Sequence, residues 1–213
     1  MLRIENNKII FHYDAEELWI EGWGESGLRV RATKNAQMPD ENWVLDPSDR
    51  TDAETEQTDK GAWIRNGKAE LFITNGGKIT VYDKSGNLLM EEYWRNRRDV
   101  TDKKCSAIEV EAREFCPNIG GDYHLTMRWE SLDKNEKLFG MGQYQQPYLD
   151  LKGLDLELAH RNSQASVPFL ISSKGYGLLW NNPGIGRAVL GKNIISFEAF
   201  GTKALDYWIT VGD

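Results

Sequence analysis

The sequence contains no run of about 18 consecutive apolar residues, which is the length that a helix needs to cross a membrane. Its first residues also lack the basic segment followed by an apolar segment that marks a secretory signal. Hydrophobic residues make up 40% and charged residues 28% of the chain, values typical of a soluble globular protein. We therefore expect no signal peptide, no membrane partner and a cytoplasmic location.

Cysteine and histidine are scarce, with two and three copies in the chain. Cys105 and Cys116 lie in what reads as one extended strand, at odd and even positions that would face opposite sides. A disulfide between them would need a bend, so we expect free thiols, as in a reducing compartment. The scattered histidines give no ligand spacing for a metal, and we expect neither a metal nor another cofactor.

Basic residues are outnumbered, since 26 Lys and Arg face 33 Asp and Glu for a net charge of −7. Nucleic-acid binding depends mainly on Lys and Arg that neutralise phosphates, so this balance excludes nucleic acid as a partner. A neutral partner such as a sugar fits the charge, and so does an ordinary cytosolic protein.

Short segments of alternating polarity dominate the chain. In residues 28–33 Leu28, Val30 and Ala32 alternate with polar side chains, the period of a half-buried strand. Residues 42–60 are polar and acidic without such a pattern, and we predict a long solvated loop there. The same reasoning predicts strands over residues 8–13, 18–23, 28–33, 69–74, 78–83, 88–93, 106–115, 123–129, 167–172, 176–180, 194–200 and 205–211.

Glycines mark the turns between these segments. Gly76-Gly77 and Gly175 lie where hairpins are expected, and glycine adopts the positive φ of such turns without steric cost. Gly140 and Gly142 are expected to permit close backbone packing or positive φ. Frequent turns without an amphipathic helix predict an all-β fold, a large antiparallel β-sandwich with few or no helices, formed by residues 1–213 as one unit.

Four motifs, in this order, resemble the N-terminal domain of glycoside hydrolase family 31, which includes α-glucosidases and α-xylosidases. The resemblance runs from about Trp63 to Asp213. It implies a galactose-mutarotase-like β-sandwich. The motifs are LFGMGQYQQ from residue 138, RNS from residue 161, VPFLISSKGYGLLWNN from residue 167 and LDYWITVGD from residue 205.

The resemblance also implies where the chemistry lies. In the family the catalytic aspartates belong to a (β/α)₈ barrel that follows this domain, and active sites on that fold lie on its loops. We expect that barrel after residue 213, so no catalytic residue is expected within this chain. The implied partners are the chain's own C-terminal barrel and an α-linked oligosaccharide. The implied full-length protein is a retaining hydrolase, this chain alone is expected to be inactive, and a bare barrel-facing surface could lead to oligomers.

In the family, the loop equivalent to residues 160–164 reaches over the barrel mouth and can touch the bound sugar. Relatives often carry Asn-Arg-Asp where this chain has Arg161-Asn162-Ser163, so the carboxylate is missing, although Asn162 and Arg161 can still hydrogen-bond a hydroxyl. Gln143 replaces a glutamate of many relatives, and Tyr144 could also face the sugar. An alternative reading of the loop is local capping. The substrate-binding residues that we expect are Gln143, Gln145, His160, Arg161, Asn162 and Ser163.

Two other functions stay open from the residues. A free-standing carbohydrate-binding module would expose a cluster of aromatic side chains, drawn from Trp19, Trp23, Trp43, Trp63 and Trp94. A mutarotase-like epimerase would bring a histidine and a carboxylate together in a concave face. Asp150, Asp155 and Glu157 alternate with leucines and are expected on the outer face of a strand.

Overall fold

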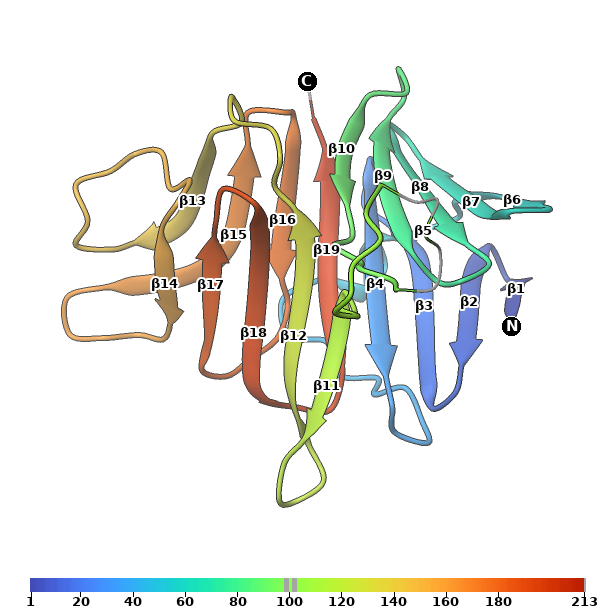
Figure 1. Cartoon of the computed structure of the whole chain (residues 1–213), viewed down its shortest axis with the longest axis horizontal. Helices are drawn as coiled ribbons and strands as arrows, with labels where there is room; N and C mark the ends of the chain where they lie inside the picture. The colour runs from blue at the N-terminus through green and yellow to red at the C-terminus, as the bar shows by residue number, and fades with distance from the viewer. Residues whose placement is uncertain (98–99, 101–102, 213) are drawn as a thin grey trace.

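The computed structural model describes residues 1–97, 100 and 103–212, and within them the chain is built from β-strands (Figure 1). The strands form three antiparallel sheets, accompanied by one short 3₁₀ helix, η1 (Pro47–Asp49). The all-β prediction is confirmed. No helix in the described part of the chain has the length and apolar character to cross a membrane.

The nine-stranded sheet has the order β1-β2-β3-β4-β19-β16-β15-β13, with β5 paired to β3. Its strands are β1 (Leu2–Glu5), β2 (Lys8–Tyr13), β3 (Glu16–Trp23), β4 (Gly27–Thr33), β5 (Arg50–Thr51), β13 (Leu138–Gln143), β15 (Ala165–Ser172), β16 (Tyr176–Trp180) and β19 (Leu205–Val211).

Two five-stranded sheets complete the fold, in the orders β10-β9-β8-β7-β6 and β11-β12-β18-β17-β14. The first contains β6 (Glu54–Thr58), β7 (Gly61–Asn66), β8 (Ala69–Thr74), β9 (Ile79–Asp83) and β10 (Leu88–Glu91). The second contains β11 (Arg113–Pro117), β12 (Tyr123–Glu130), β14 (Asp155–Leu158), β17 (Gly186–Leu190) and β18 (Ile194–Thr202). In Figure 1 the strands β12, β18 and β17 lie in front of β19, β16 and β15.

One apolar cluster fills the space between the sheets. Trp129 of β12 meets Tyr207 of β19 edge-on at 5.4 Å between ring centroids, and Trp180 of β16 lies 5.5 Å from Phe197 of β18. Aromatic rings in such arrangements contribute beyond the area they bury. The expected sandwich is therefore closed by contacts between its two layers.

Two segments differ from expectation. The predicted loop over residues 42–60 contains η1, β5 and β6, because β6 pairs with β7 through its backbone and needs no apolar face to do so. The predicted strand over residues 106–115 is a strand only from Arg113 onward. Arg113 in this strand is buried, and Cys105 and Cys116 are free but do not share one strand.

Arg113 is buried because it binds groups from the other two sheets. Its Nε donates to Glu16 Oε1 of β3 at 2.6 Å, and its Nη2 donates to the carbonyl of Gly77 at 3.0 Å. Its Nη1 pairs with Glu92, a fully buried carboxylate just after β10 that also accepts a hydrogen bond from the backbone of Ile79. Burial raises the pKa of Glu92, and Arg113 opposes this by favouring the ionised form.

A backbone irregularity ends β13 next to the polar loops. Gly140, Met141 and Gly142 have φ of 94°, 65° and 91°, and the register with β15 shifts between Gly140 and Gly142. A Cβ atom on Gly142 would lie 2.3 Å from the carbonyl oxygen of Ala165. The expected positive φ and close packing are both confirmed here, as is the positive φ of Gly175 in the β15–β16 turn.

We predict that Gly142→Ala destabilises the chain more than Gly86→Ala. Both positions have positive φ, but nothing lies within 4 Å of a Cβ on Gly86. Each variant therefore carries the left-handed penalty of about 1–2 kcal/mol, and Gly142→Ala adds an overpacking cost of about 1–3 kcal/mol. Urea unfolding of the two variants measures the difference; equal losses would contradict the close approach at Gly142.

Candidate functional site

The polar loops lie at one end of the strands of the nine-stranded sheet, where β13 and β16 end and β15 and β19 begin. We call this end of the strands the sheet edge. Residues 144–164 leave this sheet after β13, add β14 to the second five-stranded sheet beside β17, and return into β15 (Figure 1). This segment is anchored far from the edge by Glu136, which is buried. Glu136 accepts hydrogen bonds from Ser172 and Tyr176 and pairs with Lys152 at 2.8 Å.

A tight hairpin forms the outermost part of this segment. The backbones of Arg161 and Gln164 exchange two hydrogen bonds of 3.2 Å, which leaves Asn162 and Ser163 at the tip. Both tip side chains are exposed and form no hydrogen bond to another described residue. We call residues 159–164 the site hairpin.

Arg161 is held against β14. Its Nε and Nη2 donate to the two carboxylate oxygens of Glu157 at 2.9 and 2.5 Å, a bidentate pair. The hydrogen bonds from Arg161 lower the pKa of Glu157. Glu157 and Asp155 both point outward from β14, as predicted, whereas Asp150 lies in a loop and caps the backbone of Leu138 and Lys152.

The first cavity lies between the site hairpin and the sheet edge and has a volume of about 390 Å³. His160 and Arg161 line it, so the structure brings these two predicted residues together. Asn162 and Ser163 extend beyond it, and Gln143 and Gln145 are exposed and do not line it. Its other lining residues are Leu158, Ala159, Ser166, Pro168, Trp180, Asn182, Pro183, Gly184 and Ile185.

Tyr144 positions the hairpin. Its hydroxyl donates to the carbonyl of Glu157 at 2.8 Å and lies 2.9 Å from Ser166 Oγ. Burial raises the pKa of Tyr144, so the hydroxyl stays protonated and able to donate. The side chain that the sequence placed toward the sugar thus joins the segment to β15.

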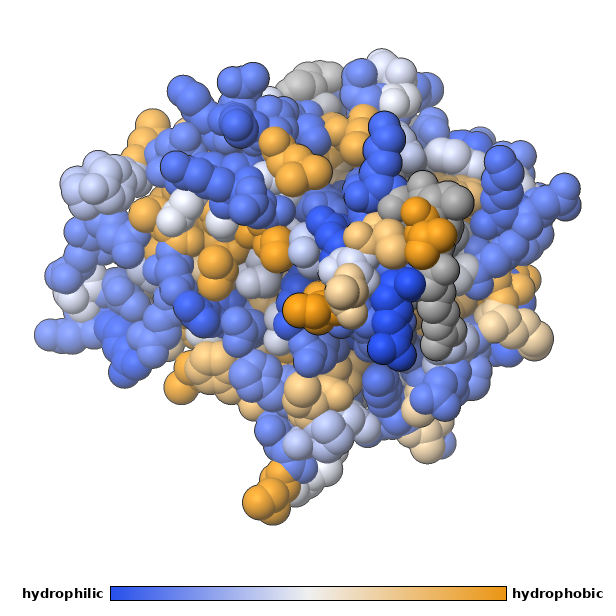
Figure 2. Space-filling view, viewed as in Figure 1, coloured by the Kyte–Doolittle hydropathy of each residue, from blue (hydrophilic) through white to orange (hydrophobic). Residues whose placement is uncertain are grey.

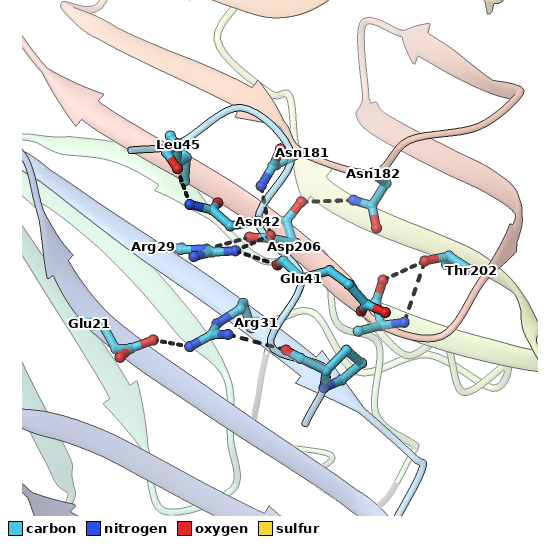
Figure 3. A network of polar contacts seen from close by, with 12 residues as sticks. Glu21, Arg29, Arg31, Glu41, Asn42, Leu45, Asn181, Asn182, Thr202 and Asp206 are labelled. Atoms are coloured by element: carbon cyan, nitrogen blue, oxygen red, sulfur yellow. Dashed lines mark hydrogen bonds and ion pairs between the residues drawn. The ribbon is translucent and has the colours of Figure 1, made fainter. Parts of the chain in front are cut away.

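A buried polar network lies beside the first cavity (Figure 3). Arg29 of β4 donates to both carboxylate oxygens of Asp206 of β19, at 3.0 and 2.6 Å. Asn181 donates to the same carboxylate, and Asn182 donates to the backbone oxygen of Asp206, both at 2.7 Å. Burial raises the pKa of Asp206, which the hydrogen bond from Arg29 opposes. Sequence reasoning missed this network, although Asn181, Asn182 and Asp206 lie within the motifs that it singled out.

Neither alternative function finds the arrangement of side chains that it predicts among the described residues. Of the five tryptophans considered for an aromatic platform, only Trp43 is exposed. His124 does lie 3.0 Å from Glu198, but both are on the outward side of β12 and β18 and line none of the three cavities described for this structure. An epimerase needs its acid and base in a cleft that encloses the sugar.

Comparison with known proteins agrees with this geometry. Residues 17–186 match the family model described as the glycosyl hydrolase 31 N-terminal galactose mutarotase-like domain. An uncharacterized family 31 glucosidase of Pseudescherichia vulneris is 45% identical over 97% of this chain, which spans 40% of that protein's length. An alpha-xylosidase of Saccharolobus solfataricus is 30% identical over 66% of the chain, which spans 18% of its length.

A solved structure gives the same answer at the level of the fold. The crystal structure of a GH31 alpha-xylosidase from a soil metagenome, complexed with xylose, matches all of this chain with a TM-score of 0.94 and 42% identity. The chain covers 32% of that protein. The curated and solved relatives are thus much longer than these 213 residues.

We predict that Arg161→Gln raises the pKa of Glu157 back toward its ordinary value of 4.5. The folded-state pKa is lowered, so the ion pair's contribution is complete above the unfolded pKa and is lost as pH falls through the lowered value. Carboxyl-detected NMR titration measures the change. Asp155 lies on the same strand as Glu157, and Arg187 of β17 lowers its pKa, so the pKa of Asp155 is the internal control and should not change. An unchanged pKa of Glu157 would refute the pairing.

Proposed function

Because the chain belongs to the family of glycosyl hydrolase 31 N-terminal galactose mutarotase-like domains, we propose that it is the non-catalytic N-terminal domain of a retaining α-glycosidase acting on α-xylosides or α-glucosides. The names of its relatives, which include xylosidases and a glucosidase, support that substrate class. A retaining mechanism needs two carboxyl groups about 5–5.5 Å apart across the scissile bond. The carboxylates nearest the candidate site are already paired, Glu157 with Arg161 and Asp206 with Arg29.

The proposal that this domain supports a catalytic domain rests on one observation, an apolar outer face on the nine-stranded sheet. Side chains at alternate positions of β15 point away from the core, and Val167 and Ile171 are 52% and 46% exposed. Cross-strand pairing extends this face, since Ile171 pairs with Phe139 of β13 and Phe169 pairs with Leu179 of β16. We call these five residues the outer apolar face.

Contiguous exposed apolar surface of this kind marks an interaction site. Figure 2 shows the opposite surface, over β11, β12, β18 and β17, which is mostly hydrophilic and carries several groups of apolar residues. The relatives are longer than this chain, and we propose that the catalytic barrel domain, which would follow residue 213, covers the outer apolar face.

The site hairpin then supplies the polar contact with substrate. His160 and Arg161 at the first cavity, with the unpaired side chains of Asn162 and Ser163 at the tip, present donors and acceptors that suit the hydroxyl groups of an α-linked oligosaccharide. Gln143 and Gln145 stay candidates on the neighbouring surface. The free thiols of Cys105 and Cys116 support a cytoplasmic location, and the chain without its barrel could self-associate through the outer apolar face.

We predict that Ile171→Asp is tolerated by the 213-residue chain but damages a longer enzyme that contains its catalytic domain. In the chain alone the position is exposed, and surface substitutions change the free energy of unfolding by about 0.5 kcal/mol or less. In the longer enzyme the new carboxylate would be buried without a partner, at a cost on the order of 3 kcal/mol. Thermal unfolding of both proteins measures this.

Leu88→Asp is the matched control, because Leu88 is 45% exposed on β10, which belongs to a different sheet from the outer apolar face. It should have the same small effect in both proteins. An Ile171→Asp variant that behaves like Leu88→Asp in the longer enzyme would rule out docking at this face.

A further inference from the structure

A second cavity, of about 310 Å³, lies next to the first and shares Asn182 and Pro183 with it. We call it the edge cavity. It lies over the buried network of Figure 3, and none of the site hairpin lines it. Its lining residues are Arg31, Pro39, Glu41, Trp43, Asp122, Asn181, Asn182, Pro183, Gly201, Thr202, Lys203, Ala204 and Asp206.

Asn181 contributes an unsatisfied acceptor to this cavity. The side chain is only 3% exposed, and its Nδ2 donates to the carboxylate of Asp206. That bond fixes the orientation of the amide, because a carboxylate accepts hydrogen bonds and only the NH₂ group can donate to it. The Oδ1 atom therefore faces elsewhere, and it has no hydrogen-bond partner. A buried acceptor is costly to leave unpaired, so a ligand that donates a hydrogen bond is favoured here.

The charges around the cavity argue against an anionic ligand. Arg31 is paired with Glu21 and Asp206 with Arg29, so these buried groups neutralise each other. The carboxylates of Glu41 and Asp122 and the ammonium of Lys203 form no ion pair or side-chain hydrogen bond within the described residues. The unpaired charges of this set are two carboxylates and one ammonium, which disfavours an anion. The Nε of Arg31 also has no hydrogen-bond partner and is a further donor of a residue that lines the cavity.

A metal ion is also disfavoured. The acidic residues of the cavity do not converge, since no group of three or more His, Cys, Asp or Glu within the described residues could hold a metal ion. Hydroxyl groups, which both donate and accept, satisfy acceptors such as Asn181 Oδ1 and donors such as Lys203 in one molecule.

Trp43 gives the cavity an apolar wall. Of the eight tryptophans in the chain only Trp43 is exposed, with 61% of its surface accessible. An indole that borders a polar cavity pairs a flat apolar surface with hydrogen-bonding groups, and the C–H face of a sugar ring with its hydroxyl edge has the complementary character. The volume lies at the lower end of small-ligand pockets, about 300–1,000 Å³.

We propose that the edge cavity binds a single neutral sugar ring, at a site separate from the site hairpin. The ring lies against Trp43, and one of its hydroxyl groups donates to Asn181 Oδ1. This site does not depend on the proposed docking of a barrel, and either can fail without the other.

The test is a titration of the ¹⁵N-labelled 213-residue chain with D-xylose and D-glucose, followed by ¹H–¹⁵N NMR. We expect saturable shifts of the side-chain amides of Asn181 and Asn182 and of the indole N–H of Trp43. Trp43→Ala should weaken binding at least tenfold. Tyr13→Ala is the matched control, since Tyr13 is an aromatic residue that is 67% exposed elsewhere on the surface, and its affinity should equal that of the unmodified chain.

Several results would overturn the proposal. They are the absence of saturable shifts at Asn181 with either sugar, equal affinity in the Trp43→Ala and Tyr13→Ala variants, and shifts confined to residues 159–164. Methylguanidinium serves as a cationic probe. Binding of this probe at Asn181 in preference to both sugars would identify the cavity as the receptor of a cationic side chain and would also overturn the proposal.

Discussion

The arrangement of the three sheets depends on one buried guanidinium group. Arg113 of β11 binds Glu16 on the nine-stranded sheet and Glu92 and the Gly77 carbonyl on the β6–β10 sheet, so one side chain contacts both other sheets. Removing one partner of such a buried set typically costs about 3–5 kcal/mol, because a charge is left without compensation. The apolar cluster stabilises the sandwich, but apolar contacts are not directional. The hydrogen bonds of Arg113 are directional, so they fix how the sheets are placed relative to one another.

Two further buried groups join the segments that surround the candidate site. Glu136 anchors the segment between β13 and β15 at the end opposite the site hairpin. Asp206 joins β4, β19 and the turn after β16 through Arg29, Asn181 and Asn182. With its internal charges satisfied, the scaffold leaves the polar groups at the hairpin tip and around the edge cavity free for a ligand. Loops with free polar groups on a rigid β scaffold are the usual places for binding.

Local patterns in the sequence were enough to predict most strands. Residues 123–129 alternate because one side of the strand meets the core, and both this segment and residues 28–33 lie in strands of the structure. The half-buried strand expected at residues 28–33 is instead buried on both faces, because Arg29 and Arg31 pair with Asp206 and Glu21. The edge strand β6 was predicted as a loop, because backbone pairing alone holds it to β7 and its composition is that of a solvated segment. Glycines at positive φ were also foreseeable, since local sterics decide them.

The buried polar residues could not be predicted in the same way. Arg113 sits in an alternating segment that reads as surface, and its partner Glu16 is 97 positions away in the sequence. Arg29 and Asp206 are 177 positions apart, and no periodicity links them. The site hairpin was found through resemblance to a family, while the edge cavity became visible only when residues from the two ends of the chain were seen together.

The central claim is that this β-sandwich supports catalysis that takes place on another domain. The most direct measurement is the hydrolysis of an aryl α-xyloside and an aryl α-glucoside by the purified, folded 213-residue chain. The account predicts no turnover above the uncatalysed rate, because no Asp or Glu lines the first cavity and the neighbouring Glu157 is paired with Arg161. Turnover of either substrate by the chain alone would contradict it.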